Sequence, residues 1–412
     1  MTFKFKSTVA AFALIASAGA SWAECGIEAG SVRILSNDFA ALHAIAESAK
    51  TCASGTVEVT SNATSEHKNI QVPALTTNPA TYTVAVVATN SVVPLMNDDL
   101  IRPLDDLVAK YGQQLQESQL IRVDGKIMAI AFMANAQHMF YRKDILEANG
   151  IPVPKSYADV LAAAETLRSK GVMQSPIASA YKPGWDLGAE FVNTYLGTGK
   201  DFFAPGSAEL AINNADAIAV LETMKAMTGY MGQDWATYNT NEILPIWEAG
   251  ELALGISWGS RASAYIAQDS PSPDIAKVTA FAAAPTIGDG TVPGAALWWD
   301  GFTIAKNISD QDAEASFRAM MVGISPEMMQ ANSGLAVWLI KGYEATPAAT
   351  GVIANLQAGA RPYPMLPYMG MLHTALGDNL SEFLQGNETA EQALADVTAA
   401  YTAAAKEAGF LK

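Results

Sequence analysis

The chain has 412 residues, of which 50% are hydrophobic, and its 41 acidic and 25 basic side chains give a formal net charge of −16 at pH 7. Nucleic acid and anionic lipid both need clustered basic residues, and the sequence has no such cluster, so we expect neither as a partner. A chain of this length exceeds what one hydrophobic core usually serves, and two domains are expected.

The N-terminus predicts an export signal. Lys4 and Lys6 precede an uncharged, alanine-rich run that ends at Ser21-Trp22-Ala23, a small-x-small cleavage pattern. The alternative is a membrane anchor, but the apolar run is shorter than the roughly 20 residues that a spanning helix needs. We therefore expect residues 1–23 to be a signal peptide removed after Ala23, and the mature chain to be a soluble protein of the periplasm.

The sequence has two cysteines, Cys25 and Cys52. An exported protein meets an oxidising compartment, which favours a disulfide between them. Two free thiols are the alternative. A metal or catalytic role is disfavoured, because neither a second cysteine pair nor a histidine cluster accompanies them.

Strands and helices alternate at the start of the mature chain. Residues 31–37, 55–63 and 81–89 have the pattern of strands, and residues 39–52 and 66–77 have the pattern of helices. This order predicts a parallel sheet with helices on both faces, in which ligands lie beyond the carboxyl ends of the strands. Asn and Asp there can also be ordinary turn or cap residues. The candidate binding residues in these early loops are Asn37, Asp38, Glu66, His67 and Asn90.

Residues 125–171 carry the most informative local pattern. A strand is followed by Tyr141-Arg142-Lys143-Asp144, which opens a helix that stops at Gly150. Ser156 then has the position of an N-cap for a long amphipathic helix ending at Gly171.

Three stretches in this order resemble the extracellular solute-binding proteins of ABC importers, the family whose best-known member binds maltose. They are residues 140–167, residues 246–259 ("IWEAGELALGISWG") and residues 382–404. The resemblance covers essentially the whole mature chain, and the order of the motifs is its specific part. Two departures are Arg142, where the family usually has Asn, and Trp299-Asp300-Gly301, which replaces a Gly-Gly at the expected ligand cleft.

The resemblance implies an α/β fold of two Rossmann-like lobes, the type II periplasmic binding protein fold, joined by a hinge of several chain crossings. The expected lobes are residues 24–133 plus 299–331 and residues 134–298 plus 332–412. By position, the crossings are expected near Phe132–Asn135, Leu297–Asp300 and Ala331–Leu335.

A sugar has a hydroxylated rim and apolar C–H faces, so its site needs flat aromatic rings and planar polar side chains. Trp185, Trp258, and Trp298 or Trp299 are the candidate stacking rings, and core packing is the alternative for each. Because side chains alternate along a strand, Trp298 and Trp299 are expected on opposite sides, with at most one on the ligand. Asp300 is expected to accept hydroxyl hydrogen bonds or a hinge hydrogen bond.

Three further candidates complete the expected binding site: Asn135, which follows a strand, and Arg361 and Tyr363, in a proline-rich segment before the last helices. Trp235, Trp247 and Trp338 are expected to pack in the core. The four histidines show no metal-ligand spacing, and no phosphate loop or nucleophile elbow occurs in the sequence.

We therefore expect a non-enzymatic binding protein without cofactor or metal that captures a small carbohydrate or polyol. As the resemblance implies, it would act as a monomer and deliver the solute to membrane ABC permease subunits. One alternative is a betaine or other compatible solute, whose quaternary amine a tryptophan cage would hold by cation–π attraction. A secreted hydrolase of the same shape is the other.

Overall fold

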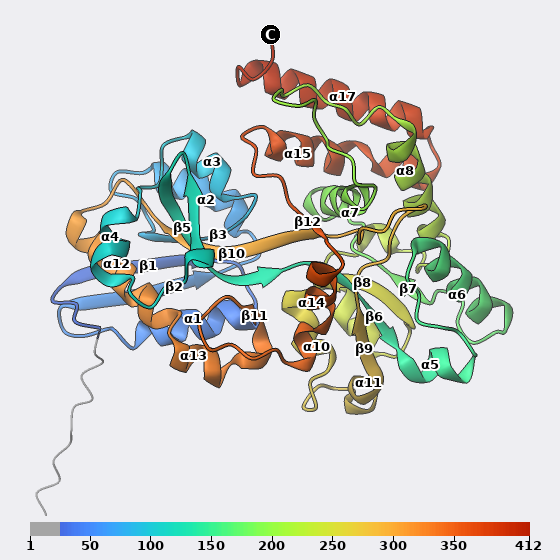
Figure 1. Cartoon of the computed structure of the whole chain (residues 1–412), viewed down its shortest axis with the longest axis horizontal. Helices are drawn as coiled ribbons and strands as arrows, with labels where there is room; N and C mark the ends of the chain where they lie inside the picture. The colour runs from blue at the N-terminus through green and yellow to red at the C-terminus, as the bar shows by residue number, and fades with distance from the viewer. Residues whose placement is uncertain (1–24) are drawn as a thin grey trace, which may run out of the picture.

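Figure 1 shows a computed structural model of the chain, which describes residues 25–412. The expected signal peptide, residues 1–23, lies outside the described residues. Two β-sheets with their own helices make up the described part, so the predicted α/β class is confirmed. No helix among residues 25–412 is long and apolar enough to cross a membrane.

The larger sheet has eight strands, in the order β11-β5-β10-β3-β1-β2, with β4 paired to β5 and β12 paired to β10. β1 is parallel to β2 and β3, as predicted, whereas β10 runs antiparallel to β3 and β5. The strands are β1 (Gly30–Ser36), β2 (Val57–Ala63), β3 (Val84–Ala88), β4 (Leu120–Val123), β5 (Lys126–Asn135), β10 (Ala296–Ile304), β11 (Val337–Trp338) and β12 (Arg361–Pro362).

Helices cover both faces of the larger sheet. Val84 and Val86 of β3 pack into one hydrophobic core and Ala85 and Val87 into another, which explains why this strand is apolar at successive positions. We call this sheet, apart from β12 and the end of β10 that pairs with it, together with its helices, the first lobe. Its helices are α1 (Ala40–Lys50), α2 (His67–Thr76), α3 (Val92–Asn97), α4 (Asp105–Tyr111), α12 (Asp310–Gly323) and α13 (Pro326–Ala331).

The smaller sheet has four strands in the order β7-β8-β6-β9 and, with its helices, forms the second lobe. Its core contains Phe140, whose ring centroid lies 4.6 Å from that of Trp247 and 4.5 Å from that of Tyr265. The strands are β6 (Gln137–Arg142), β7 (Ile177–Ala178), β8 (Leu254–Trp258) and β9 (Thr279–Ala282). The helices are α5 (Lys143–Ala148), α6 (Tyr157–Ser169), α7 (Trp185–Leu196), α8 (Ala215–Thr228), α9 (Ile243–Glu248), α10 (Ala262–Tyr265), α11 (Pro273–Val278), α14 (Thr350–Gln357), α15 (Met369–Asn379), α16 (Ser381–Gln385) and α17 (Ala390–Glu407).

Two crossings between the lobes run along strands, one through β5 and β6 and the other through β10. β5 of the first lobe ends at Asn135, and β6 of the second lobe begins at Gln137. Within β10, Trp298 packs into the core of the second lobe, whereas Phe302 packs into the core of the first. The cleft floor is therefore made of strand backbone, which fixes the side chains that rise from it.

The third crossing lies later than expected. β11 pairs with β5, and Tyr343 packs against the core of the first lobe, whereas Ala348 belongs to the core of the second. Residues 332–343, which we expected in the second lobe, thus pack with the first. The expected position of this crossing, near Ala331–Leu335, was wrong. The chain first returns along the large sheet, where β11 pairs with β5, and crosses to the second lobe only after Tyr343.

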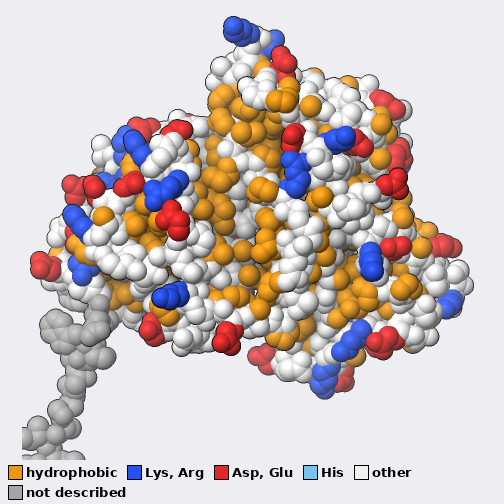
Figure 2. Space-filling model, in the orientation of Figure 1, with side chains coloured by type: hydrophobic (Ala, Val, Ile, Leu, Met, Phe, Trp, Pro, Cys, Tyr) orange, Lys and Arg blue, Asp and Glu red, His pale blue; other side chains and the backbone are white. Residues whose placement is uncertain are grey.

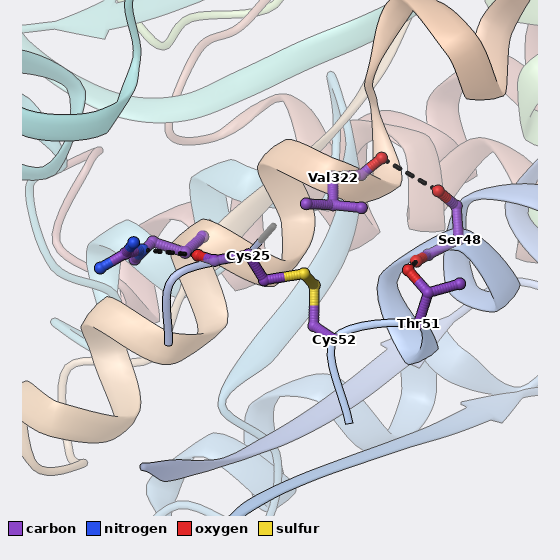
Figure 3. Close-up of a disulfide and its surroundings, with 6 residues drawn as sticks. Cys25, Ser48, Thr51, Cys52 and Val322 are labelled. Carbon is purple, nitrogen blue, oxygen red and sulfur yellow. Dashed lines mark hydrogen bonds between the residues drawn. A yellow bond between two sulfur atoms is a disulfide. The ribbon is translucent and has the colours of Figure 1, made fainter. Parts of the chain in front are cut away.

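The predicted disulfide joins Cys25 to Cys52, with Cα atoms 5.6 Å apart (Figure 3). It connects the start of the described chain to the second residue after the end of α1. Ser48 of α1 donates a hydrogen bond to the Val322 carbonyl of α12 at 3.0 Å, and Arg318 of α12 donates to the Cys25 carbonyl at 3.0 Å. The N-terminal segment is therefore fixed against α1 and α12.

The local helix signals are also confirmed. The Ser156 hydroxyl accepts a hydrogen bond from the Asp159 N–H at 3.1 Å, and the Asp159 carboxylate accepts one from the Ser156 N–H at 3.0 Å. This reciprocal pair is a capping box, and it confirms Ser156 as the N-cap of α6. Arg142 instead of Asn is accommodated by two hydrogen bonds to Asp144, at 2.9 and 2.7 Å.

Candidate functional site

A cavity of about 430 Å³ lies between the two lobes, within the usual range for small-molecule sites. The first lobe lines it with α2, α3 and the loop after β3, and the second lobe with Trp185 and the segment from Tyr363 to Thr374. Figure 2 shows hydrophobic side chains along the hollow between the lobes. Another hollow, of about 460 Å³, is lined by residues between Ala345 and Gln357, none of which is charged or aromatic. We therefore take the cavity of about 430 Å³ as the candidate site.

Five aromatic side chains of the second lobe form one cluster beside this cavity: Trp185, Trp258, Trp298, Tyr363 and His373. The Trp298 ring centroid lies 6.0 Å from that of Trp185, 5.5 Å from that of Trp258 and 4.1 Å from that of Tyr363. The Tyr363 hydroxyl and His373 Nδ1 share a hydrogen bond of 3.1 Å. Sequence reasoning named four of these residues, and it missed His373 as a cluster member.

Backbone geometry brings Trp185 and His373 together. Gly184, with φ of 98°, turns the chain so that Trp185 is the first residue of α7. A Cβ on Gly188 would lie 2.6 Å from the His373 carbonyl, so glycine there permits the close approach of α15 to α7. The His373 ring then stacks on the Trp185 ring, with centroids 5.2 Å apart and planes 22° apart. Burial lowers the pKa of His373 to about 4, so this ring is neutral at pH 7.

Two cationic side chains reach across the cleft. The Lys68 ammonium, from α2 of the first lobe, lies 3.3 Å from the Trp185 ring centroid. Arg261 of the second lobe lies over the Phe39 ring, 4.9 Å from its centroid, and donates hydrogen bonds to the Asp38 carbonyl at 3.4 Å and to Asn241 at 3.1 Å. Each lobe thus sends one cation onto an aromatic ring of the other.

Two carboxylates balance these cations. Asp300 lies in β10 at the cleft floor, and Asp186 follows Trp185 in α7, where it accepts a hydrogen bond from Thr240 at 2.9 Å. Burial raises the pKa of Asp300 to about 7, against the opposing effects of Lys68 and Arg261. Burial lowers the pKa of Lys68 to about 8, although Asp300 and Asp186 both act to raise it. The four charges therefore form one electrostatically coupled group.

Three buried polar atoms at the site have no hydrogen-bond partner within the described part of the chain: Trp185 Nε1, Trp298 Nε1 and Asn90 Oδ1. Buried polar groups are normally paired. Trp185 and Asn90 line the cavity, so one donor and one acceptor are available to the polar groups of a solute.

Of the predicted early-loop residues, Asn90 lies at the cavity, whereas Asn37, Asp38 and Glu66 do not line it. The Asn37 side chain accepts a hydrogen bond from the Asp38 N–H at 2.8 Å, and the Asp38 carboxylate pairs with His43 at 2.8 Å, so these side chains make local turn and helix contacts. Glu66 is exposed and accepts a hydrogen bond from Asn69 at 2.7 Å.

His67, Asn135 and Arg361 were also candidates, and the structure engages them outside the cavity lining. His67 is buried in α2, and burial lowers its pKa to about 4. Asn135 accepts hydrogen bonds from the N–H groups of Ala136 at 3.0 Å and Ser260 at 3.1 Å, so it joins the hinge to the second lobe. Arg361 donates to the Asp201 carboxylate and to the Lys200 carbonyl.

The two hinge tryptophans face opposite sides, as strand alternation predicted. Trp298 belongs to the aromatic cluster, whereas Trp299 packs against a core of the first lobe. The Trp299 N–H donates to Thr89 Oγ1 at 3.0 Å. Trp298 is therefore the member of the pair on the cluster side.

Lys68, Asp186 and Arg261 are the site residues that sequence reasoning missed. Asp186 adjoins Trp185, and Lys68 adjoins His67, so proximity to named candidates was a usable signal for both. Arg261 carries no local signal, because only the closure of the lobes brings it to Phe39. Within residues 25–412 no group of three or more His, Cys, Asp or Glu side chains is placed to hold a metal ion.

The family model for bacterial extracellular solute-binding proteins matches residues 35–321. The chain belongs to this family of solute-binding proteins. A probable ABC transporter-binding protein of Deinococcus radiodurans is 25% identical over 191 residues, which are 45% of this chain and 44% of that protein. The chain thus spans less than half the length of this curated relative.

Solved structures of other solute-binding proteins share the fold. The maltose-bound MalE3 of T. maritima has a TM-score of 0.78 at 17% identity, covering 91% of this chain and 100% of that one. The Agrobacterium radiobacter K84 protein in complex with ribitol has a TM-score of 0.76 at 18% identity, covering 91% and 98%. The D-mannitol-bound protein of Agrobacterium vitis S4 has a TM-score of 0.74 at 19% identity, covering 92% and 99%.

Proposed function

We propose that this solute-binding protein captures a small carbohydrate or polyol between its lobes. The observation that carries the proposal is the cavity between the lobes, which Trp185 and Tyr363 border and in whose lining Trp185 Nε1 and Asn90 Oδ1 have no hydrogen-bond partner within residues 25–412. Indole rings suit the C–H faces of a sugar, and unpaired donors and acceptors suit its hydroxyls. That structural relatives carry maltose, ribitol and D-mannitol supports the same class of solute.

The protein works by a hinge equilibrium and breaks no bond of the solute. A solute shifts this equilibrium only through its higher affinity for the closed form, so it must contact both lobes. Asn90 supplies a contact from the first lobe, and Trp185 and Tyr363 supply contacts from the second.

The closed protein then delivers the solute to the membrane subunits of an ABC importer. The N-terminal sequence pattern supports export to the periplasm with cleavage after Ala23, and the acidic composition is consistent with a partner other than nucleic acid. We propose that the protein acts there as a monomer, without cofactor or metal.

Thermal unfolding of residues 24–412 against a panel of sugars, polyols, amino acids and betaines tests this function. A solute at about 100 times its Kd stabilises the folded state by roughly 2.7 kcal/mol, which is a readable shift. A rise with a sugar or polyol supports the proposal. A rise confined to amino acids or betaines would overturn it.

A further inference from the structure

The face of Trp185 that a solute needs is already occupied by the protein itself. His373 stacks on the ring with centroids 5.2 Å apart, and the Lys68 ammonium lies 3.3 Å from the ring centroid. A distance of 3.3 Å leaves no room for a solute between the ammonium and the ring. A solute can therefore stack on Trp185 only if Lys68 moves away.

Lys68 is the charged group of the site that can leave most easily. Arg261 is held by hydrogen bonds to the Asp38 carbonyl and to Asn241, and Asp186 accepts one from Thr240. Asp300 lies in a hinge strand that pairs on both sides. Lys68 makes no hydrogen bond within residues 25–412, and its long side chain borders the open cavity.

The departure of Lys68 removes the cation from the Trp185 ring, where its ammonium lies 3.3 Å from the centroid. Asp300 and Asp186 both favour the charged form of Lys68, so its departure also removes an attraction to these two carboxylates. A neutral solute replaces neither interaction. A cation brought by the solute replaces both.

We propose that the solute carries a protonated amino group, which takes the place of the Lys68 ammonium on Trp185. This inference rests on the proposed function and narrows it to amino sugars and amino polyols. The hydroxyls of such a solute meet Trp185 Nε1 and Asn90 Oδ1, and its ammonium lies where Asp300 and Asp186 now attract the Lys68 ammonium. His373, neutral behind the ring, adds no competing positive charge.

Calorimetry with matched pairs of probes tests the inference on the wild-type protein near pH 7. The pairs are D-glucosamine and D-glucose, D-galactosamine and D-galactose, D-mannosamine and D-mannose, and the amino polyol D-glucamine with D-sorbitol. We expect the amine of at least one pair to bind more than tenfold tighter than its hydroxyl partner. Equal or tighter binding of the hydroxyl partner overturns the inference and leaves the proposed function standing.

Variants of Lys68 show whether this lysine only occupies the place of the solute ammonium or contacts the solute itself. If the lysine only occupies the place of the solute, Lys68→Met removes a competitor, and the amine that binds wild type binds this variant several-fold tighter. Weaker binding would mean that the solute uses Lys68 directly, which contradicts the inference. Lys126→Met, on an exposed lysine of the same lobe, is the matched control and should leave the Kd unchanged.

If no probe of the panel binds, a chemical-rescue experiment tests whether the place of the Lys68 ammonium accepts a free ammonium ion. Lys68→Ala opens a site for a free ammonium, so butylammonium chloride should raise the Tm of this variant. Butylammonium chloride should not raise the Tm of wild type or of Lys126→Ala. Butanol and sodium chloride should leave the Tm of all three proteins unchanged. Absence of an ammonium-specific rise overturns the inference, whereas binding of betaines or amino acids alone overturns the proposed function as well.

Discussion

Arg261 of the second lobe and Phe39 of the first lobe form a cation–π contact across the cleft, with the guanidinium carbon 4.9 Å from the ring centroid. The same guanidinium donates to the neighbouring Asp38 carbonyl at 3.4 Å. Phe39 precedes α1, at the carboxyl end of β1, so the contact lies at the strand edge where ligands of parallel sheets bind. The contact connects closure of the lobes to the geometry of the site.

Arg261→Gln is therefore expected to favour the open form. A cation–π contact at an exposed site contributes about 0.5–1 kcal/mol, so its loss should raise the ratio of open to closed molecules about two- to fivefold. Small-angle X-ray scattering of the ligand-free protein should then give a larger radius of gyration. Arg168→Gln is the control, because Arg168 lies over Tyr230 at 4.2 Å within one lobe, and a radius of gyration equal in both variants would refute the role of Arg261.

Trp258→Ala is expected to weaken solute binding by more than tenfold, about 1.4 kcal/mol. Trp258 is 7% exposed and holds the position of Trp298, the hinge member of the cluster, at 5.5 Å between ring centroids. Calorimetry with the carbohydrate that the thermal panel identifies measures the change. Trp235→Ala, a half-buried tryptophan packed on Tyr181 outside the cluster, should bind normally, and a normal Kd in both variants would remove Trp258 from the site.

Much of the fold was predictable because its signals are local. The apolar strand Val84–Ala88, the Ser156 cap and the alternation of Trp298 and Trp299 each depend on residues close in sequence. The third crossing was not predictable in this way. It depends on the pairing of β11 with β5, residues about two hundred positions apart, which leaves no trace in local composition.

The aromatic part of the site was predictable for the same reason, whereas the charged part was not. Trp185, Trp258 and Trp298 begin or lie on elements that sequence patterns reveal. Lys68 and Arg261 acquire their roles only when the lobes close, because each contacts a ring of the opposite lobe. Arg361 was predicted as a binding residue from its position before the last helices, but its guanidinium donates to the Asp201 carboxylate instead of lining the cavity.

Asp300→Asn is expected to change the pH dependence of stability. The Asp300 carboxyl has an ordinary pKa of 3.8, and burial raises it to about 7 in the folded protein. Between these values the folded state binds more protons than the unfolded state, so rising pH destabilises the wild type through this group, and the loss is complete above about pH 7. Each pKa unit corresponds to about 1.4 kcal/mol, reduced here because the side chain is only half-buried.

Asparagine does not ionise, so the Tm of Asp300→Asn minus that of wild type should increase from about pH 4.5 to about pH 8. Scanning fluorimetry across this range measures the difference. Asp274→Asn, at an exposed position, is the control and should differ from wild type by a constant amount. A difference for Asp300→Asn that is constant or falls with pH would contradict the burial of its charge.

Replacing both cysteines, Cys25→Ser with Cys52→Ser, is expected to lower the free energy of unfolding of the whole chain. The disulfide closes a loop with a sequence separation of 27, and loop-closure entropy for this length corresponds to roughly 3.5 kcal/mol in the unfolded state. Urea unfolding at constant pH measures the loss, and wild type unfolded in the presence of a reductant should approach the variant. Ser48 and Arg318 keep their contacts with α12 and the N-terminal segment in the folded variant, so solute affinity should change little. Equal unfolding free energies in the variant and the oxidised wild type would mean that the bridge does not restrict the unfolded chain.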